Sequence, residues 1–200
     1  MRRRMMMQSG GGIPKPPEGI VFLDSVKTTS TDTLYLDYIP RWCDGFEADI
    51  EFIGTINTND EAGIVSRTTW GGSTMWGWNS NRSQNRFVYR EGFIAGITLN
   101  ISNTRCVLKM DRGSWSQQLG SRSLSGTYRF VDLKEEANGS PVYVTGSGTA
   151  RVRIRQLNIT DGKGDYIRKY IPAYLNGVYC LYEMYTGLIN YGPSDTYFEE

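Results

Sequence analysis

The chain has 200 residues and no histidine, and this absence removes several kinds of chemistry at once. Histidine is the commonest general base, the usual partner of serine and cysteine nucleophiles, and a frequent metal ligand. The three cysteines, Cys43, Cys106 and Cys180, are widely separated and form no Cys-x-x-Cys pair, so neither a zinc knuckle nor a redox motif is expected. We expect buried, reduced thiols, with one disulfide as the alternative, and neither a bound metal nor a cofactor.

Long apolar runs and an excess of either charge are also missing. No segment approaches the roughly 20 apolar residues that a membrane span requires. The N-terminal MRRRMMMQ has too short an apolar run for a signal peptide, which predicts that the chain is not exported by the standard secretory route. The 22 basic and 21 acidic side chains give a net charge of +1, which argues against a nucleic-acid partner.

Aromatic residues, glycines and alternating patterns are abundant instead. Aromatics make up 12% of the chain and glycines number 23, a composition that favours pleated strands joined by tight turns. Roughly a dozen short strands at this spacing predict a sandwich or barrel. A short helical turn near residues 133–137 and a loop over 138–148 are also expected. The predicted strands cover residues 20–26, 33–39, 46–53, 64–69, 75–79, 86–90, 97–101, 106–110, 115–119, 128–133, 150–159, 166–171 and 178–182.

The domain organisation follows from composition. Residues 1–18 read as a flexible N-terminal arm and a Gly/Pro linker, and residues 19–200 as one all-β domain. Within the domain, residues 46–52 show the cleanest alternation, which places Phe46, Ala48, Ile50 and Phe52 inside and the acidic residues between them outside. Pro172 cannot donate to a sheet ladder, so it should end its strand or lie on an edge.

The last quarter of the chain carries motifs of a known family. They are an aliphatic strand around Ile154, the turn Asp161-Gly162, the segment IRKYIP at 167–172, GVYCLYE at 177–183, and a closing Gly187, Asn190 and Gly192. This pattern resembles the LamG-like domains of bacteriophage, prophage and gut-bacterial proteins, which are concanavalin A-like jelly rolls. Glu183 replaces the family's usual Asp, and Leu188-Ile189 replace its aromatic pair.

The front half of the chain agrees with this resemblance. DTLYLDYIP at 32–40, FEADIEFIG at 46–54 and GIVSR at 63–67 are similar to the family's opening strands, and the Met/Arg/Gly arm is similar to arms on proteins of phages that infect gut Bacteroidetes. The resemblance implies a two-sheet antiparallel jelly-roll sandwich. It says less about function, because one fold hosts many functions.

Three acidic residues on one predicted strand form the first candidate site. Glu47, Asp49 and Glu51 fall on one face and resemble the catalytic strand of family-sixteen glycoside hydrolases, in which the first Glu is the nucleophile and the second the acid/base. The alternative is a solvated face of a half-buried strand. Four steps along a strand span about 13 Å, against the roughly 5 Å between the carboxyl groups of retaining enzymes. We therefore predict no catalytic residues.

Two further segments are candidate binding sites. Trp70, Trp76, Trp78 and Asn79 combine aromatic faces with an amide, as sugar sites do, although the tryptophans also suit a core. The arm can grip an acidic or apolar groove on another protein, with a solvated tail as the alternative. Its docking residues would be Arg2, Arg3, Arg4, Met5, Met6 and Met7.

The sequence is compatible with three functions. The first is a non-enzymatic virion structural protein of a bacteriophage: a head-fibre or tail-fibre component on the virion surface, homo-oligomeric, docked to other virion proteins through its arm and able to bind a host glycan. The second is a free or cell-surface carbohydrate-binding lectin domain, and the third is a β-glucan hydrolase.

Overall fold

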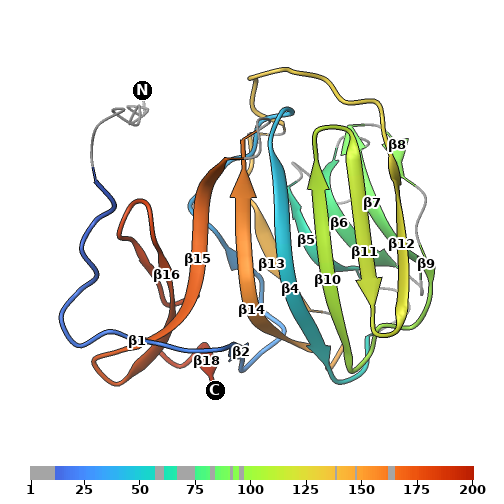
Figure 1. Ribbon diagram of the computed structural model, residues 1–200. Coiled ribbons are helices and arrows are strands. Elements are labelled where there is room, and N and C mark those ends of the chain that lie inside the picture. Colours follow the sequence, from blue (N-terminus) through green and yellow to red (C-terminus); the bar gives the residue numbers. More distant parts are fainter. Residues whose placement is uncertain are drawn as a thin grey trace.

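The computed structural model describes residues 12–56, 61–66, 75–81, 84–90, 92–94, 97–137, 139–146, 148–161 and 165–200 (Figure 1). These residues form strands and connecting segments, without a helix. Accordingly, no helix within them is long and apolar enough to cross a membrane. The strands that form belong to two antiparallel sheets.

Eleven of the described strands form the larger sheet, and every pairing in it is antiparallel. Its main path is β12 (Arg122–Thr127), β11 (Ser114–Leu119), β10 (Thr104–Asp111), β4 (Gly45–Ile53), β14 (Arg151–Thr160), β15 (Tyr166–Leu175), β16 (Val178–Glu183) and β17 (Ile189–Asn190). Outside that path, β1 (Val21–Phe22) pairs with β15, β2 (Val26–Thr28) with β14, and β18 (Phe198–Glu199) with β2.

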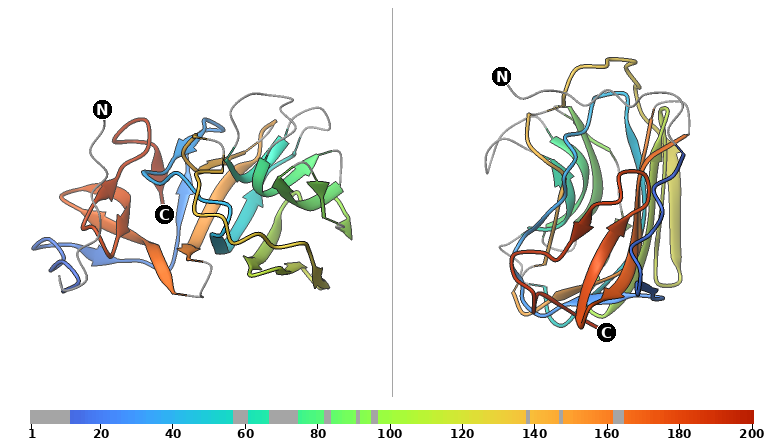
Figure 2. Two further views of the ribbon diagram at one scale, coloured as in Figure 1. Left: turned by 90° about the horizontal axis from the view of Figure 1, so that it is seen from above. Right: turned by 90° about the vertical axis from the view of Figure 1, so that its left-hand side faces the viewer.

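Seven of the described strands form the smaller sheet. Its path is β3 (Leu34–Tyr35), β13 (Tyr143–Thr145), β5 (Glu61–Ser66), β6 (Met75–Asn81), β7 (Gln84–Arg90) and β8 (Gly92–Phe93), with β9 (Ile97–Thr98) beside β7. In Figure 2 the two sheets are seen facing each other.

The alternating sequence of β4 places one set of side chains between the two sheets. Phe46, Ile50 and Phe52 are fully buried. The Phe46 ring lies 5.4 Å from that of Trp76, and the Phe52 ring 6.2 Å from that of Trp78, across the gap between the sheets. The predicted inward face of this strand is confirmed, and so is the all-β sandwich, an arrangement consistent with a jelly roll.

The three cysteines belong to the interior, as expected. Each is buried and free. Burial raises the pKa of Cys106 to about 12 and that of Cys180 to about 11, so both remain thiols near neutral pH.

A second, smaller core lies at one end of the sandwich, where β15 and β16 run beyond β14 (Figures 1 and 2). We call this part the end lobe: β1, the second half of β15, β16 and β17. Its buried side chains are Ala173, Leu175, Cys180 and Tyr182. The N-terminal segment covers it, because Phe22 packs on Tyr182 with ring centroids 5.9 Å apart.

Pro172 does not end its strand as predicted, since β15 continues through it to Leu175. Its partner in β16 is Leu181, and its carbonyl accepts a hydrogen bond of 2.9 Å from the Leu23 amide. A carbonyl and the nitrogen of the same residue point to the same side of a strand, so the missing N–H faces the point where β1 replaces β14 as the neighbour of β15. Leu23 lies opposite Pro172 in the continued register, and its carbonyl lacks the reciprocal ladder bond, at the point where the β1 pairing ends.

Two predicted segments differ from the structure. Residues 128–133 cross irregularly between the sheets instead of forming a strand, and the preceding residues form β12. The sequence RSLSGT of β12 gave no signal, because its side chains are almost all exposed and backbone pairing with β11 holds the strand. The apolar side chains of residues 128–133, which follow β12, pack in the irregular segment that connects the two sheets. Tyr89 Oη donates there to the Val131 carbonyl at 3.4 Å.

The predicted loop over residues 138–148 contains β13, which pairs with both β3 and β5. Tyr143 and Val144 are buried, and the β-favouring run VYVT was the signal for this strand. The predicted helical turn at 133–137 is also wrong. Glu136 instead forms an isolated antiparallel bridge with Arg41.

Candidate functional site

The acidic residues of β4 lie on the outer face of the larger sheet, the face turned away from the smaller sheet. Glu47, Asp49 and Glu51 are half-buried there, as predicted. Each already has a cationic partner on a neighbouring strand. Glu47 accepts from Lys109 Nζ at 2.7 Å, Asp49 pairs with Arg105, and Glu51 accepts from Arg155 Nη2 at 2.8 Å.

These ion pairs are unlike an acid/base pair. Burial raises the pKa of Glu47, but hydrogen bonds from Lys109 and Tyr166 outweigh it and hold the pKa below its usual value. A general acid needs a raised pKa instead. The arrangement fits a solvated face of partly exposed ion pairs, each of which contributes about 0–1 kcal/mol to stability.

The predicted sugar platform is wrong for three of its four residues. Trp76 and Trp78 are fully buried between the sheets, so neither ring face is open to a sugar. Their indole nitrogens are occupied as well, donating to the Asp44 carbonyl at 3.0 Å and to Gln117 Oε1 at 3.1 Å. Asn79 is buried too and accepts from Arg86. Trp70 and the docking residues of the arm lie outside the described residues.

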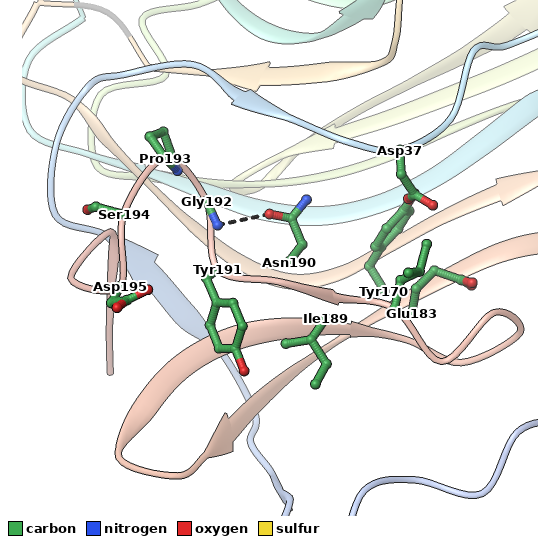
Figure 3. A pocket seen from close by; sticks show the side chains of 11 residues that line it. Asp37, Tyr170, Glu183, Ile189, Asn190, Tyr191, Gly192, Pro193, Ser194 and Asp195 are labelled. Atoms are coloured by element: carbon green, nitrogen blue, oxygen red, sulfur yellow. Dashed lines mark hydrogen bonds between the residues drawn. The ribbon is translucent and has the colours of Figure 1, made fainter. Parts of the chain in front are cut away.

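A pocket of about 420 Å³ lies beside the end lobe, formed by residues that sequence reasoning had not selected (Figure 3). Asp37 comes from the segment after β3, Tyr170 from β15 and Glu183 from the end of β16. The remaining wall is the C-terminal turn from Leu188 to Asp195. We call this the C-terminal pocket.

Glu183 holds in place the backbone of the turn that leads into the pocket wall. Its carboxylate is buried and accepts from the Lys169 amide at 2.8 Å and the Tyr185 amide at 3.2 Å through Oε1. Through Oε2 it accepts from the Thr186 amide at 2.8 Å and the Thr186 hydroxyl at 2.6 Å. Four donors on one carboxylate make Glu183 a structural group that holds the β16–β17 turn.

Tyr170 and Asp37 form the opposite side. The Tyr170 hydroxyl donates to Asp37 Oδ1 at 2.8 Å, and Arg168 Nε lies 3.9 Å from Asp37 Oδ2. Burial raises the pKa of Tyr170, and the Asp37 charge raises it further, so the phenol stays protonated and keeps its hydrogen bond. Asp37 itself is partly exposed and lines the pocket.

Asn190 shapes the turn that closes the pocket. Its amide group donates to the Tyr35 carbonyl at 3.0 Å and accepts from the Gly192 amide at 2.9 Å, the bond drawn in Figure 3. Gly192 has a φ of 77°, and a Cβ there would lie 2.1 Å from Tyr197 Cδ1. Only glycine fits this position, which explains the Asn-x-Gly in the closing motif.

The pocket offers apolar surface beside oxygen acceptors. Leu188 is half exposed and Tyr191 half-buried, while Ser194 and Asp195 are exposed on the turn. The sequence signal for this site was the closing motif itself, which we had used only for the fold. Among the described residues, no group of three or more His, Cys, Asp or Glu could hold a metal ion.

Comparisons with known proteins leave the family open. No protein-family model matches the chain, and no curated protein matches it. Fourteen chains of solved structures match, among them a mutant of Trypanosoma rangeli sialidase that displays trans-sialidase activity. That match has 16% identity and a TM-score of 0.35, and it covers 58% of this chain.

The matched region covers 20% of the sialidase, so this chain spans about a fifth of its length. At that TM-score the similarity supports no conclusion about activity. The all-β sandwich is established by the structure, and the LamG-like family remains a prediction from the motifs.

Proposed function

We propose that this chain is a non-enzymatic structural protein of a bacteriophage virion, a head-fibre or tail-fibre component, whose sandwich domain binds a neutral host-surface glycan in the C-terminal pocket. The observation that carries the binding role is the pocket itself. Its volume of about 420 Å³ falls within the roughly 300–1,000 Å³ of small-molecule sites.

The chemistry of the pocket favours a sugar. Leu188 and Tyr191 offer an apolar wall for the C–H face of a ring, and the exposed carboxylates of Asp37 and Asp195 can accept hydrogen bonds from hydroxyl groups. A neutral glycan is favoured over an acidic one, because these two carboxylates would repel an anionic sugar.

Binding without catalysis is supported by the carboxylates of β4. Each is engaged by a cationic side chain on the outer face. The virion role rests on the resemblance to phage domains and on an arm with three Arg and four Met within its first seven residues. A fibre must fix one end to a particle while its domain samples the host surface, and a homo-oligomer would add avidity to a weak glycan site.

The double substitution Asp37→Asn and Asp195→Asn tests the pocket. It removes two charged acceptors at nearly constant volume, and we expect glycan affinity to fall by about tenfold or more. The measurement is a glycan array followed by calorimetry with the best-bound glycan. Asp24→Asn, an exposed acid outside the pocket, is the matched control and should leave affinity unchanged. Equal affinities of the double variant and the control, or no bound glycan, would contradict the proposal.

Deletion of residues 1–12 tests the virion role separately. The shortened chain should fold with an unchanged far-ultraviolet circular dichroism spectrum and still bind the glycan, but it should be absent from purified particles. The measurement is quantitative immunoblotting of particles from infected host cells that express either chain. Incorporation of the shortened chain at the full-length level would place the attachment elsewhere, and absence of the full-length chain from particles would favour a free lectin.

A further inference from the structure

Strand β14 carries an extra residue that faces outward. Its register with β4 shifts between Ile154, which pairs with Ile50, and Gln156, which pairs with Asp49. Arg155 is the unpaired residue of this β-bulge. Bulges re-aim side chains and occur often beside functional sites. Here the bulge allows Arg151, Arg153, Arg155 and Gln156 all to face the outer surface while Val152, Ile154 and Leu157 stay buried.

Two of these arginines compete for one carboxylate oxygen. Arg155 Nη2 lies 2.8 Å and Arg153 Nη1 3.6 Å from the same atom, Glu51 Oε2. The two guanidinium groups therefore lie side by side and repel each other. Arg153 Nε and Arg155 Nη1 are both inaccessible to solvent and have no hydrogen-bond partner. Buried donors without acceptors are rare in native proteins, so Glu51 alone does not satisfy this pair of guanidinium groups.

The surrounding face has more positive than negative charge. A second pair of cations, Lys27 and Arg151, also shares one carboxylate, Glu199, through Oε1 at 2.8 and 3.2 Å. With Arg105 on Asp49, the ion pairs around Asp49, Glu51 and Glu199 comprise five cations and three carboxylates, and Lys109 and Glu47 form a balanced pair beside them. An excess of two positive charges is concentrated here, although the whole chain carries only +1.

Toward the β12 edge of the larger sheet, the outer face carries serine and glutamine side chains that can hydrogen-bond to hydroxyl groups. A shallow depression of about 520 Å³ lies over β10, β11 and β12 and is lined by three serines, two glutamines and two aliphatic residues: Ser116, Ser123, Ser125, Gln117, Gln118, Val107 and Leu124. Val107 and Gln156 both pair with Asp49, so the depression and the arginine pair are separated by about 10 Å, two strand spacings. Serine and glutamine side chains pair with sugar hydroxyls, whereas single-stranded nucleic acid is bound mainly on aromatic platforms.

We propose that the outer face of the larger sheet binds an acidic polysaccharide, with its sulfate, phosphate or carboxylate group held between Arg153 and Arg155 and its hydroxyl groups against the Ser/Gln depression. An oxyanion would accept hydrogen bonds from the solvent-facing N–H groups of the two guanidinium groups and relieve the repulsion between the two cations. Both side chains are more than a quarter exposed, at 29% and 27%, so the anion reaches them from solvent. This site is separate from the C-terminal pocket.

The test compares dextran sulfate with uncharged dextran, using the full chain and calorimetry at about 50 mM salt. Wild type should bind dextran sulfate, with affinity falling steeply as salt rises, and should not bind dextran. Arg153→Gln with Arg155→Gln should weaken binding by about tenfold or more. Arg122→Gln with Arg129→Gln removes the same charge at exposed positions and should change affinity less than about twofold.

Three controls keep the result specific. Arg153→Lys with Arg155→Lys keeps the charge but loses the forked donors, so we expect an intermediate affinity. Because this variant keeps a cation beside Glu51, it also shows whether a loss of binding in the glutamine variant comes from misfolding. Inorganic sulfate should compete weakly. The Asp37→Asn and Asp195→Asn variant should bind dextran sulfate normally, which separates this site from the pocket.

Equal losses in the two arginine double variants would reduce the binding to net charge and overturn the site. Tighter binding of a single-stranded oligonucleotide of the same charge would overturn the choice of polysaccharide.

Discussion

Gly77→Ala is expected to lower the free energy of unfolding by about 3–5 kcal/mol, because it combines backbone strain with a clash in the sheet. Gly77 has a φ of 130° and lies in β6 between the two buried tryptophans. A Cβ at this position would lie 2.1 Å from the Ile64 carbonyl oxygen and 2.8 Å from Val65 Cα, both on the paired strand β5. Neither backbone atom can move without separating the strands.

Gly177→Ala is the matched control for that result. Gly177 has a φ of 89° in the β15–β16 turn, and no atom lies within 4 Å of its would-be Cβ. The Gly177→Ala substitution should lower the free energy of unfolding only by the backbone strain, about 1–2 kcal/mol. Urea denaturation of the three proteins measures the difference. Similar losses in both variants would mean that β5 and β6 are not paired as described.

Glu183→Ala should produce the second large effect, a loss of about 3 kcal/mol in the free energy of unfolding. The substitution leaves the donors of Lys169, Tyr185 and Thr186 without their acceptor in a partly buried turn. Because this turn forms the wall of the C-terminal pocket, glycan binding should be lost as well.

Glu183→Gln keeps one carbonyl acceptor and the shape of the side chain, so we expect it to lose only about half as much free energy of unfolding as Glu183→Ala does. Denaturation gives the energies, and hydrogen exchange of the Tyr185 and Thr186 amides reports the turn directly. If the alanine variant protects these amides as well as wild type does, Glu183 is not what holds the turn.

The sequence predicted well wherever burial alone decides the structure. In β4 the alternation of Phe46, Ala48, Ile50 and Phe52 with acidic residues had one solution, because a strand has only two faces. The prediction from sequence failed where backbone pairing, not burial of side chains, determines whether a strand forms. β12 has almost no buried side chain, and its existence depends on the neighbouring strand β11.

The candidate site was harder to predict than the fold. Trp76 and Trp78 have the same identity and spacing whether their faces meet a sugar or the Phe46 and Phe52 rings, and only the packing of the second sheet distinguishes the two. The C-terminal pocket joins Asp37 to residues more than 130 positions later, as the hydrogen bond to Tyr170 shows. No local pattern marks such a contact.

The bulge in β14 also has a consequence for how this surface can change over generations. If Arg155 is left out, outward- and inward-facing residues alternate from Arg151 to Leu157, and both halves of the strand keep their register with β4. The residue is therefore a one-codon addition that extends the surface without disturbing any packed side chain. Insertion, deletion or exchange at this point gives selection a means to retune what the outer face recognises while the fold stays constant, as a protein that must follow a changing host surface would need.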